Sequence, residues 1–313
     1  RKKLRRAQVL EFFSQLPACV VAMEACGGAH FWGREIGKLG HDVRLIPPAY
    51  VKPFVKRQKN DMADAEAICE AAMRPTMRFV PVKSEETQGA AMVFRVRELL
   101  IRQRTQAINA LRGHLAEFGQ IFPQGAANTS RLIAIVEDPE NDLPANAVPT
   151  LKALISALAH LEAEIRKLDA EIAHRAKEND VARRLMTIPG IGPLIATAIA
   201  VLAPPPKTFR KARDFAAWLG LVPRQHSTGG KQRLGATTRM GERSLRRLLI
   251  LGANSVIIKR HVHSSARPGT WLAGMLSRKP PMLVRVALAN KMARIVWALM
   301  VKGQDYRAPA AAA

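Results

Sequence analysis

The first eighty residues alternate between helix-like and strand-like patterns of apolar side chains. Apolar residues recur every three or four positions over residues 1–16, which predicts a helix that Pro17 ends. The run over residues 19–23 is continuously apolar and stops at Glu24, a pattern typical of a strand buried on both faces of a sheet. The elements expected next are a helix over residues 29–39, a strand over 41–46 and a helix over 60–72 that opens with an asparagine cap. This alternation predicts half of an α/β sandwich.

A two-stranded parallel sheet is not a stable domain by itself. We therefore expect the partner strands of this domain to lie upstream of Arg1. The chain also does not begin with methionine, so we expect it to be a fragment or a processed product.

Helical patterns dominate the remaining residues. Residues 84–118 predict a long polar helix with several arginines, and residues 123–149, rich in Pro, Asn and Asp, predict a loop. Leucine and isoleucine then alternate spacings of three and four over residues 151–172, which is the apolar seam of a coiled coil. That seam can pair with a second copy of the chain or fold back on the 84–118 helix as an antiparallel hairpin, and both alternatives stay open.

These patterns predict three domains. They are an incomplete α/β domain over residues 1–83, long helices with a coiled coil over 84–180, and a mostly helical carboxyl domain over 181–313. The carboxyl domain contains the most electropositive stretch of the chain, residues 207–260.

The charge balance points to a polyanionic partner. Lysine and arginine number 49 against 25 acidic residues, for a formal charge of +24. Such a surplus repels itself, and nucleic acid is the usual polyanion that neutralises it. The apolar runs are too short to span a bilayer, which argues against a membrane protein, and no signal peptide is evident. The three cysteines show no metal-site spacing and fit a reducing compartment, so we expect a cytoplasmic protein that binds DNA.

Three carboxylates are candidate catalytic residues and metal ligands. Glu24 follows the first strand, the usual place for a functional side chain in an α/β sheet. Asp61 and Asp64 are three residues apart at a helix start, so their carboxylates share one face. Mg²⁺ prefers oxygen ligands of this kind, and Lys56 and Lys59 just upstream are suited to hold DNA phosphates. The plainer alternative is that the two aspartates only favour the helix dipole.

A glycine-rich turn separates two predicted helices at residues 188–192. Pro189, Gly190 and Gly192 form a pattern typical of a helix-hairpin-helix, in which backbone N–H groups at a helix start contact a DNA phosphate. A purely structural tight turn is the alternative.

A second glycine-rich segment, residues 220–231, contains a serine among basic residues. Ser227 is a candidate nucleophile for a phosphodiester, because nearby cations would stabilise the charge that develops on the phosphoryl group. His226 is a possible base that is adjacent in sequence, and Ser227 could equally be a hydroxyl that only contacts phosphate. The basic residues expected to bind DNA here are Arg224, Lys231, Arg233 and Arg239.

These segments, together with others, resemble the DEDD transposases of the "one-ten" insertion-sequence family. The matching segments are 23–30, 51–56, 59–65, 74–80, 188–192, 220–230 and 286–291. They occur in the same order as in the family and extend over nearly the whole chain.

The resemblance implies a Holliday-junction-resolvase-like (RuvC-like) RNase H fold with a metal-binding Asp, Glu, Asp, Asp set. Glu24, Asp61 and Asp64 match the last three members, and Ser227 matches the nucleophilic serine of the carboxyl domain. The family implies DNA cutting with Mg²⁺ through a phosphoserine link, guided by a structured RNA. It also implies homo-oligomers, dimers or tetramers, held in part by a coiled coil, for which residues 151–172 are the candidate.

The chain departs from the family pattern at its start. The first Asp of the family set belongs to the first strand of the sheet, and we expect that strand to be missing before Arg1. Two other functions therefore stay open. The chain could be a non-catalytic DNA-binding remnant of such an element, or a nuclease like a Holliday-junction resolvase that uses carboxylates alone.

Overall fold

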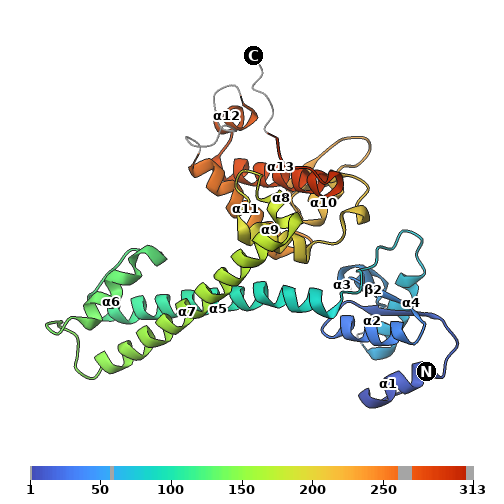
Figure 1. The fold of residues 1–313 in the computed structure, drawn as a ribbon, viewed down its shortest axis with the longest axis horizontal. Helices are drawn as coiled ribbons and strands as arrows, with labels where there is room; N and C mark the ends of the chain where they lie inside the picture. The colour runs from blue at the N-terminus through green and yellow to red at the C-terminus, as the bar shows by residue number, and fades with distance from the viewer. Residues whose placement is uncertain (1, 57–59, 260–269, 308–313) are drawn as a thin grey trace. The chain divides into compact units, whose positions relative to one another are not determined.

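The computed structural model describes residues 2–56, 60–259 and 270–307. The contacts divide the chain into two compact units, Arg1–Ala90 and Ala91–Ala313, and each unit is described by itself. Figure 1 shows the elements of both. The three-domain division expected from the sequence stays a prediction.

The first unit is built on a small parallel sheet. β1 (Val20–Glu24) and β2 (Asp42–Ile46) pair in parallel along their full length, and α2 (Ala29–Lys38) connects them. α4 (Asp61–Ala72) packs against both strands. The alternation of helices and strands expected from the sequence is confirmed. The other elements are η1 (Arg6–Gln8), α1 (Val9–Ser14), α3 (Pro48–Val51) and η2 (Lys52–Phe54).

Two details of this unit differ from the sequence-based expectation. The helix expected over residues 1–16 begins only at Arg6 and ends at Ser14, because the first residues are mostly basic and repel one another along a helix face. β1 is not buried on both faces: Val20 is 51% exposed and the rest of the strand is half-buried. Within the described residues β1 pairs only with β2, so no strand pairs with its other edge.

The core of the first unit depends on small side chains of α4. Ala67 and Ala71 are fully buried one turn apart and pack in one cluster with Ile46, the last residue of β2. Alanines allow the helix backbone to come close to the strands. This packing fixes the helix whose first turn carries Asp61 and Asp64.

Two long helices of the chain form an antiparallel hairpin. α5 (Glu85–Glu117) and α7 (Val148–Glu178) run side by side (Figure 1). Arg97 of α5 pairs with Asp169 of α7 through contacts of 2.5 and 3.3 Å. Farther along, one apolar cluster contains Ile108, Leu111 and Leu115 from α5 and Leu151 and Leu158 from α7. The heptad seam of α7 thus packs against α5 of the same chain, which was one of the two alternatives. Its pairing with a second copy stays a prediction.

The prediction of a loop over residues 123–149 was wrong in part, because this segment contains a helix. α6 (Thr129–Glu137), preceded by η3 (Ala126–Asn128), buries Leu132 and Val136 in the cluster that α5 and α7 share. Leu132 and Val136 are four residues apart, which was a helical signal that the Pro and Asn around it obscured.

The carboxyl part of the second unit is a helical core with one small hairpin. Its helices are α8 (Asp180–Leu185), α9 (Pro193–Leu202), η4 (Pro206–Thr208), α10 (Ala212–Trp218), α11 (Arg243–Ile258), α12 (Trp271–Leu276) and α13 (Pro281–Lys302). α13 packs against α10 and α11, and apolar residues of all three share one core. The mostly helical carboxyl region expected from the sequence is confirmed.

The serine-containing segment is part of a small hairpin, and Ser227 lies in the connection between its two strands. β3 (Pro223–Gln225) and β4 (Leu234–Thr237) pair as an antiparallel hairpin. Among the residues that the structure describes, no helix is both long enough and apolar enough to cross a membrane.

Candidate functional site

The predicted acidic residues occupy the end of one element and the start of another. Glu24 is the last residue of β1, and its side chain is half-buried. Asp61 and Asp64 lie in the first turn of α4, which begins because the Asn60 side chain accepts a hydrogen bond of 2.8 Å from the Ala63 backbone N–H. Both aspartates are therefore at the positive end of the helix dipole, as the plainer alternative also requires.

These carboxylates differ from others of the same unit in having no described partner. Within the described ranges, no side chain forms a hydrogen bond or ion pair with Glu24, Asp61 or Asp64. Glu66, on the same helix, instead pairs with Lys56 at 2.8 Å. That hydrogen bond raises the pKa of Lys56 above the ordinary lysine value. Lys56, expected to hold DNA phosphate, is thus bound to a carboxylate.

The three acids suit a divalent cation in their chemistry and do not by themselves form a site for one. Oxygen ligands without a competing cation are what Mg²⁺ requires. In the described part of the chain, however, no three His, Cys, Asp or Glu side chains are close enough together to hold a metal ion. Lys59, the other lysine expected to contact phosphate here, lies outside the described residues.

The glycine turn between α8 and α9 is packed against another helix. Gly190 has a φ of +84°, and a Cβ there would lie 2.6 Å from the carbonyl oxygen of Gly252 on α11. Ile188 and Ile191 on either side are buried. Packing is thus a sufficient reason for the glycine at 190, as the structural alternative required. Pro189 is half-buried and Gly192 is exposed, and their contact with DNA stays a prediction.

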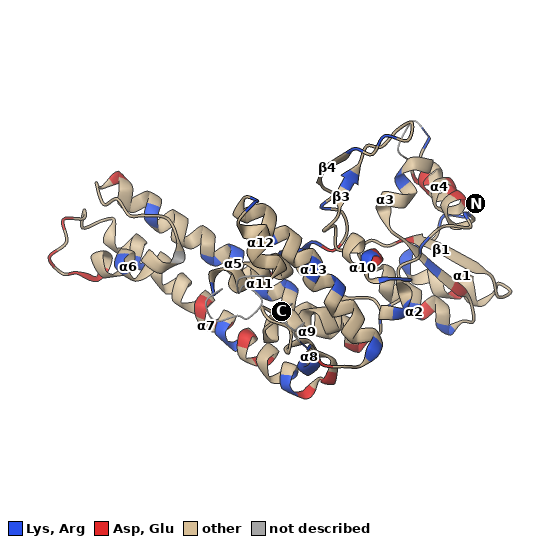
Figure 2. Ribbon diagram, turned by 90° about the horizontal axis from the view of Figure 1, so that it is seen from above, with Lys and Arg blue, Asp and Glu red and all other residues tan. Residues whose placement is uncertain are grey.

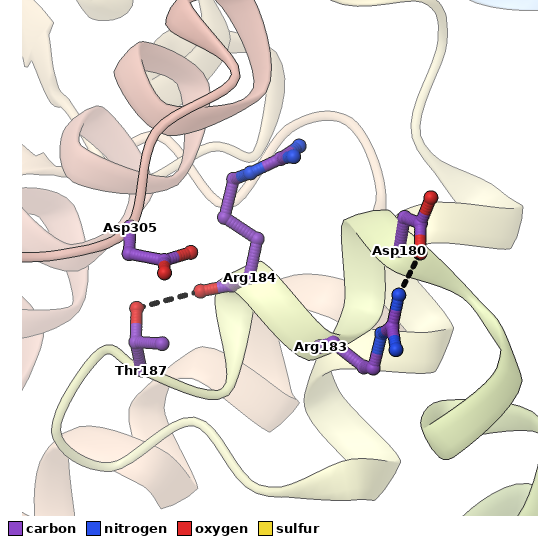
Figure 3. A pocket seen from close by; sticks show the side chains of 5 residues that line it. All are labelled: Asp180, Arg183, Arg184, Thr187 and Asp305. Atoms are coloured by element: carbon purple, nitrogen blue, oxygen red, sulfur yellow. Dashed lines mark hydrogen bonds and ion pairs between the residues drawn. The ribbon is translucent and has the colours of Figure 1, made fainter.

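An open pocket of about 370 Å³ lies beside this turn (Figure 3). In it, Arg183 pairs with Asp180, and the Thr187 hydroxyl donates to the Arg184 carbonyl at 2.7 Å. The Thr187 hydroxyl also accepts a hydrogen bond from the Tyr306 backbone N–H. Asp305 completes the lining, so two acids offset two arginines and the pocket has no charge that favours a phosphate.

The hairpin of β3 and β4 presents Ser227 to solvent. All residues from 223 to 236 are exposed. The Ser227 hydroxyl oxygen accepts a hydrogen bond of 3.1 Å from the Arg233 backbone N–H on the opposite arm. His226 donates its backbone N–H to the Arg233 carbonyl, and its ring packs over Gly235. The ring therefore lies across the hairpin, and the Ser227 hydroxyl takes its hydrogen bond from the backbone.

The predicted DNA-binding residues of this hairpin carry positive charges that no described acidic side chain neutralises. Arg224, Lys231, Arg233 and Arg239 are all exposed, and no described acidic side chain pairs with any of them. Figure 2 shows basic positions along the hairpin with no acidic position between them. A serine hydroxyl among unpaired cations on an exposed turn can approach a phosphodiester.

Two residues at the hairpin base had no role assigned from the sequence. The side chains of Arg246 on α11 and Asn290 on α13 donate hydrogen bonds to backbone carbonyls next to β3. Asn290 lies in a matching segment of the family resemblance, and a polar side chain amid the apolar residues of α13 was the available signal.

Two family descriptions match the chain. One, "Transposase IS116/IS110/IS902 family", matches residues 182–267, and a DEDD transposase description of the IS110 type matches residues 4–120.

Similar proteins extend over nearly the whole chain. The chain is 51% identical over 98% of its length to a Pseudomonas aeruginosa protein named "Probable family 20 transposase", of which it covers 91%. It is 43% identical over 97% of its length to the transposase for insertion sequence element IS1328 of Yersinia enterocolitica, covering 90% of that protein. It is 37% identical over 98% of its length to the transposase for insertion sequence element IS1111A of Coxiella burnetii, covering 84% of that protein. The chain therefore belongs to the IS116/IS110/IS902 family of insertion-sequence transposases.

Proposed function

We propose that this transposase cuts and rejoins DNA strands with Ser227 as its nucleophile. The observation that carries the proposal is the placement of the Ser227 hydroxyl on an exposed hairpin whose cations have no acidic partner. A buried or ion-paired arrangement would prevent a DNA backbone from reaching the serine. Here the phosphates of the backbone replace the missing acidic partners.

The chemistry follows from the atoms on the hairpin. The Ser227 oxygen attacks the phosphorus, so that an O–P bond to serine forms while the P–O bond to one sugar oxygen breaks. The serine proton ends on that leaving oxygen, and the phosphodiester is conserved as a phosphoserine link. The hydrogen bond from the Arg233 N–H orients the serine oxygen. Arg224 and Lys231, exposed on the same hairpin, would stabilise charge on the phosphoryl oxygens. Attack by the free sugar hydroxyl of another strand reverses the step and joins the two strands.

The DEDD family implies use of a divalent metal ion. We propose that the ion is Mg²⁺ and that Glu24, Asp61 and Asp64 are among its ligands. Such an ion, when bound, polarises phosphodiester oxygens. The three carboxylates support this role because no described cation neutralises them. Since they do not enclose an ion by themselves, the strand-cutting step above is assigned to the chain's serine alone.

DNA binding follows from the transposase family, whereas two further partners belong to the proposal. The phosphates of a structured guide RNA would neutralise part of the +24 charge. A second copy of the chain would use the seam of α7, in which Leu154, Leu161 and Leu168 are only half-buried by the intrachain hairpin.

The test of the serine uses DNA in which the leaving oxygen of the phosphodiester is replaced by sulfur. Attack then releases a thiol that rejoins poorly, so the protein–DNA adduct accumulates and is measured on a denaturing gel. We expect the adduct with the unsubstituted chain and with Thr228→Ala, the neighbouring hydroxyl on the same turn, and none with Ser227→Ala. An adduct of equal yield with Ser227→Ala would overturn the proposal and mean that another side chain is the nucleophile. Cut DNA without any adduct, equal for both chains, would also overturn it and favour a nuclease that uses carboxylates alone.

The metal role is tested by binding of Mn²⁺, followed by electron paramagnetic resonance. Asp64→Asn is expected to weaken binding, because it removes the charge of one oxygen ligand. Glu66→Gln, on the same helix but paired with Lys56, is the control and is expected to leave binding unchanged. Equal binding by both variants contradicts the assignment of Asp64.

A further inference from the structure

The chain enters and leaves the serine hairpin through two backbone segments in direct contact. A Cβ on Gly220 would lie 2.0 Å from the carbonyl oxygen of Met240, and one on Gly241 would lie 1.8 Å from that of Trp218. Both glycines have positive φ values, +68° and +80°. Any side chain at either position would force the segments apart, so residues 218–222 and 238–242 form a tightly joined base for the hairpin.

Four consecutive carbonyls of the incoming segment each accept a hydrogen bond. The pairs are Leu219 O with Arg246 Nη1 at 3.0 Å, Gly220 O with the Arg239 N–H at 3.2 Å, Leu221 O with Asn290 Nδ2 at 3.0 Å, and Val222 O with the Thr238 N–H at 2.8 Å. Two of these donors belong to the outgoing segment. The other two are side chains of the core helices α11 and α13, so the hairpin is attached to the core at this point.

Arg246 joins both segments with one nitrogen. Its Nη1 also donates to the Met240 carbonyl of the outgoing segment at 3.1 Å. Burial lowers the pKa of Arg246 below the ordinary arginine value, and the charges of Arg243 and Arg239 lower it further. Arg246 therefore uses its side chain to bind backbone carbonyls, whereas the exposed arginines of the hairpin itself have side chains that are open to solvent.

The backbone of Arg239 is held in an uncommon conformation at the same place. It is the one non-glycine residue of the described chain with a positive φ, +55°. A left-handed conformation costs a side-chain-bearing residue roughly 1–2 kcal/mol. Two hydrogen bonds maintain this conformation. The Arg239 N–H donates to the Gly220 carbonyl, and the Arg246 side chain donates to the carbonyl of Met240, the next residue. The exposed side chain of Arg239 is thereby directed from a fixed backbone.

We propose that Arg246 and Asn290 are positioning residues that orient the Ser227 hairpin toward the scissile phosphate and do not contact DNA. The inference rests on the proposed role of Ser227. Beyond Pro223 the hairpin has no buried residue, so its orientation relative to the core is determined at its base. Removing Arg246 takes the donor from two carbonyls and removing Asn290 takes it from one. Either loss lets the serine oxygen move by an ångström or more, which is enough to lower a reaction rate about 100-fold.

The experiment measures the rate of adduct formation on the sulfur-substituted DNA at saturating DNA, and separately the DNA dissociation constant. Arg246→Met and Asn290→Leu keep side-chain size and remove the donors. We expect a rate lower by 10- to 100-fold, an unchanged dissociation constant, and partial recovery of the rate in Arg246→Lys, which restores one donor. Arg243→Met, exposed on the same helix, is the matched control and should keep the full rate.

Hydrogen exchange gives a readout that does not depend on the reaction. In Arg246→Met and Asn290→Leu, the hydrogen-bonded amides of residues 224–238 should exchange at least tenfold faster, while those of α11 keep their protection. A weaker DNA affinity with unchanged exchange and unchanged rate at saturation would overturn the proposal and make Arg246 a DNA contact. If Arg246→Met fails to fold, Arg246→Lys and Asn290→Leu carry the test. An adduct with Ser227→Ala would refute the nucleophile, while the exchange data would still decide whether the two donors fix the hairpin.

Discussion

Two glycine-rich turns of the second unit resemble each other in sequence and differ in structure. Residues 188–192 and residues 227–231 both combine glycine with nearby arginine or lysine. In the first turn, Gly190 is pressed against Gly252 of α11, where a Cβ would lie 2.6 Å from a backbone oxygen. In the second turn, a Cβ on Gly229 or Gly230 would meet nothing within 4 Å.

The difference shows that glycine serves two separate needs in this protein. At Gly190 it permits a close approach of backbone to backbone inside the fold. At Gly229 and Gly230, whose φ values are +54° and +74°, it permits only the tight reversal of an exposed hairpin. The first turn therefore contributes to stability, and the second presents Ser227 and its cations.

The largest expected effect comes from filling the packed turn. Gly190→Ala places a methyl group against a backbone oxygen. It also puts alanine in a left-handed conformation that only glycine adopts without strain. Overpacking costs about 1–3 kcal/mol and the conformation adds roughly 1–2 kcal/mol, so unfolding by urea should occur at much lower concentration. Gly192→Ala, two residues away with open space and a φ of −93°, should change the free energy of unfolding by less than ~1 kcal/mol. Equal stability of the two variants would contradict the comparison.

The partner glycine on α11 should behave in the same way with a smaller effect. A Cβ on Gly252 would lie 2.4 Å from the Gly190 carbonyl oxygen, but Gly252 is helical and has no unfavourable φ. Gly252→Ala is therefore expected to cost about 1–3 kcal/mol. Gly274→Ala in α12 is the control, since its nearest neighbour is the end of the Arg278 side chain at 3.9 Å. Higher helix propensity should make that variant more stable by up to ~1 kcal/mol.

These contacts explain how far the sequence could predict the molecule. Local patterns alone predicted α2, α4, α5, α7 and both strands of the first unit. The signals included a continuous apolar run for β1, an asparagine cap for α4 and regular three- and four-residue spacing for α7. They could not separate the two glycine turns, because the reason for Gly190 is Gly252, sixty-two residues later in the chain. Long-range contacts of this kind have no local signal.

The same limit applies to the candidate site. Ser227 and the cations around it were evident as residue types, but the hairpin of β3 and β4 to which they belong was not. Residues 223–237 contain few β-branched or aromatic side chains, and the hairpin owes its position to Arg246 and Asn290 at its base. For the acids, sequence correctly placed Glu24 at the end of β1 and Asp61 and Asp64 at the start of α4. Whether these acids bind one metal ion stays a prediction.

A substitution in the exposed turn should leave the core intact. Gly230→Ala puts alanine at a φ of +74° and costs the hairpin roughly 1–2 kcal/mol. Opening the hairpin does not expose the helical core, so the free energy of global unfolding should change by less than ~0.5 kcal/mol. Hydrogen exchange at the His226 and Lys231 amides, which bridge the hairpin, should rise roughly 5- to 30-fold. A loss of global stability comparable to that of Gly190→Ala would mean that the hairpin belongs to the core.

The smallest expected effect is on the salt dependence of DNA binding, which tests whether each turn contacts DNA. Each phosphate contact contributes about 0.9 to the slope of the logarithm of the DNA association constant against the logarithm of salt concentration. Lys231→Ala and Arg233→Ala should each lower that slope by about one, because their charges have no acidic partner. Arg183→Ala, beside the packed turn, should leave the slope unchanged, since Arg183 is already paired with Asp180. If Arg183→Ala lowered the slope as much as Lys231→Ala does, the turn at 188–192 would be a DNA contact as well as a packing element, and the contrast between the turns would hold for stability alone.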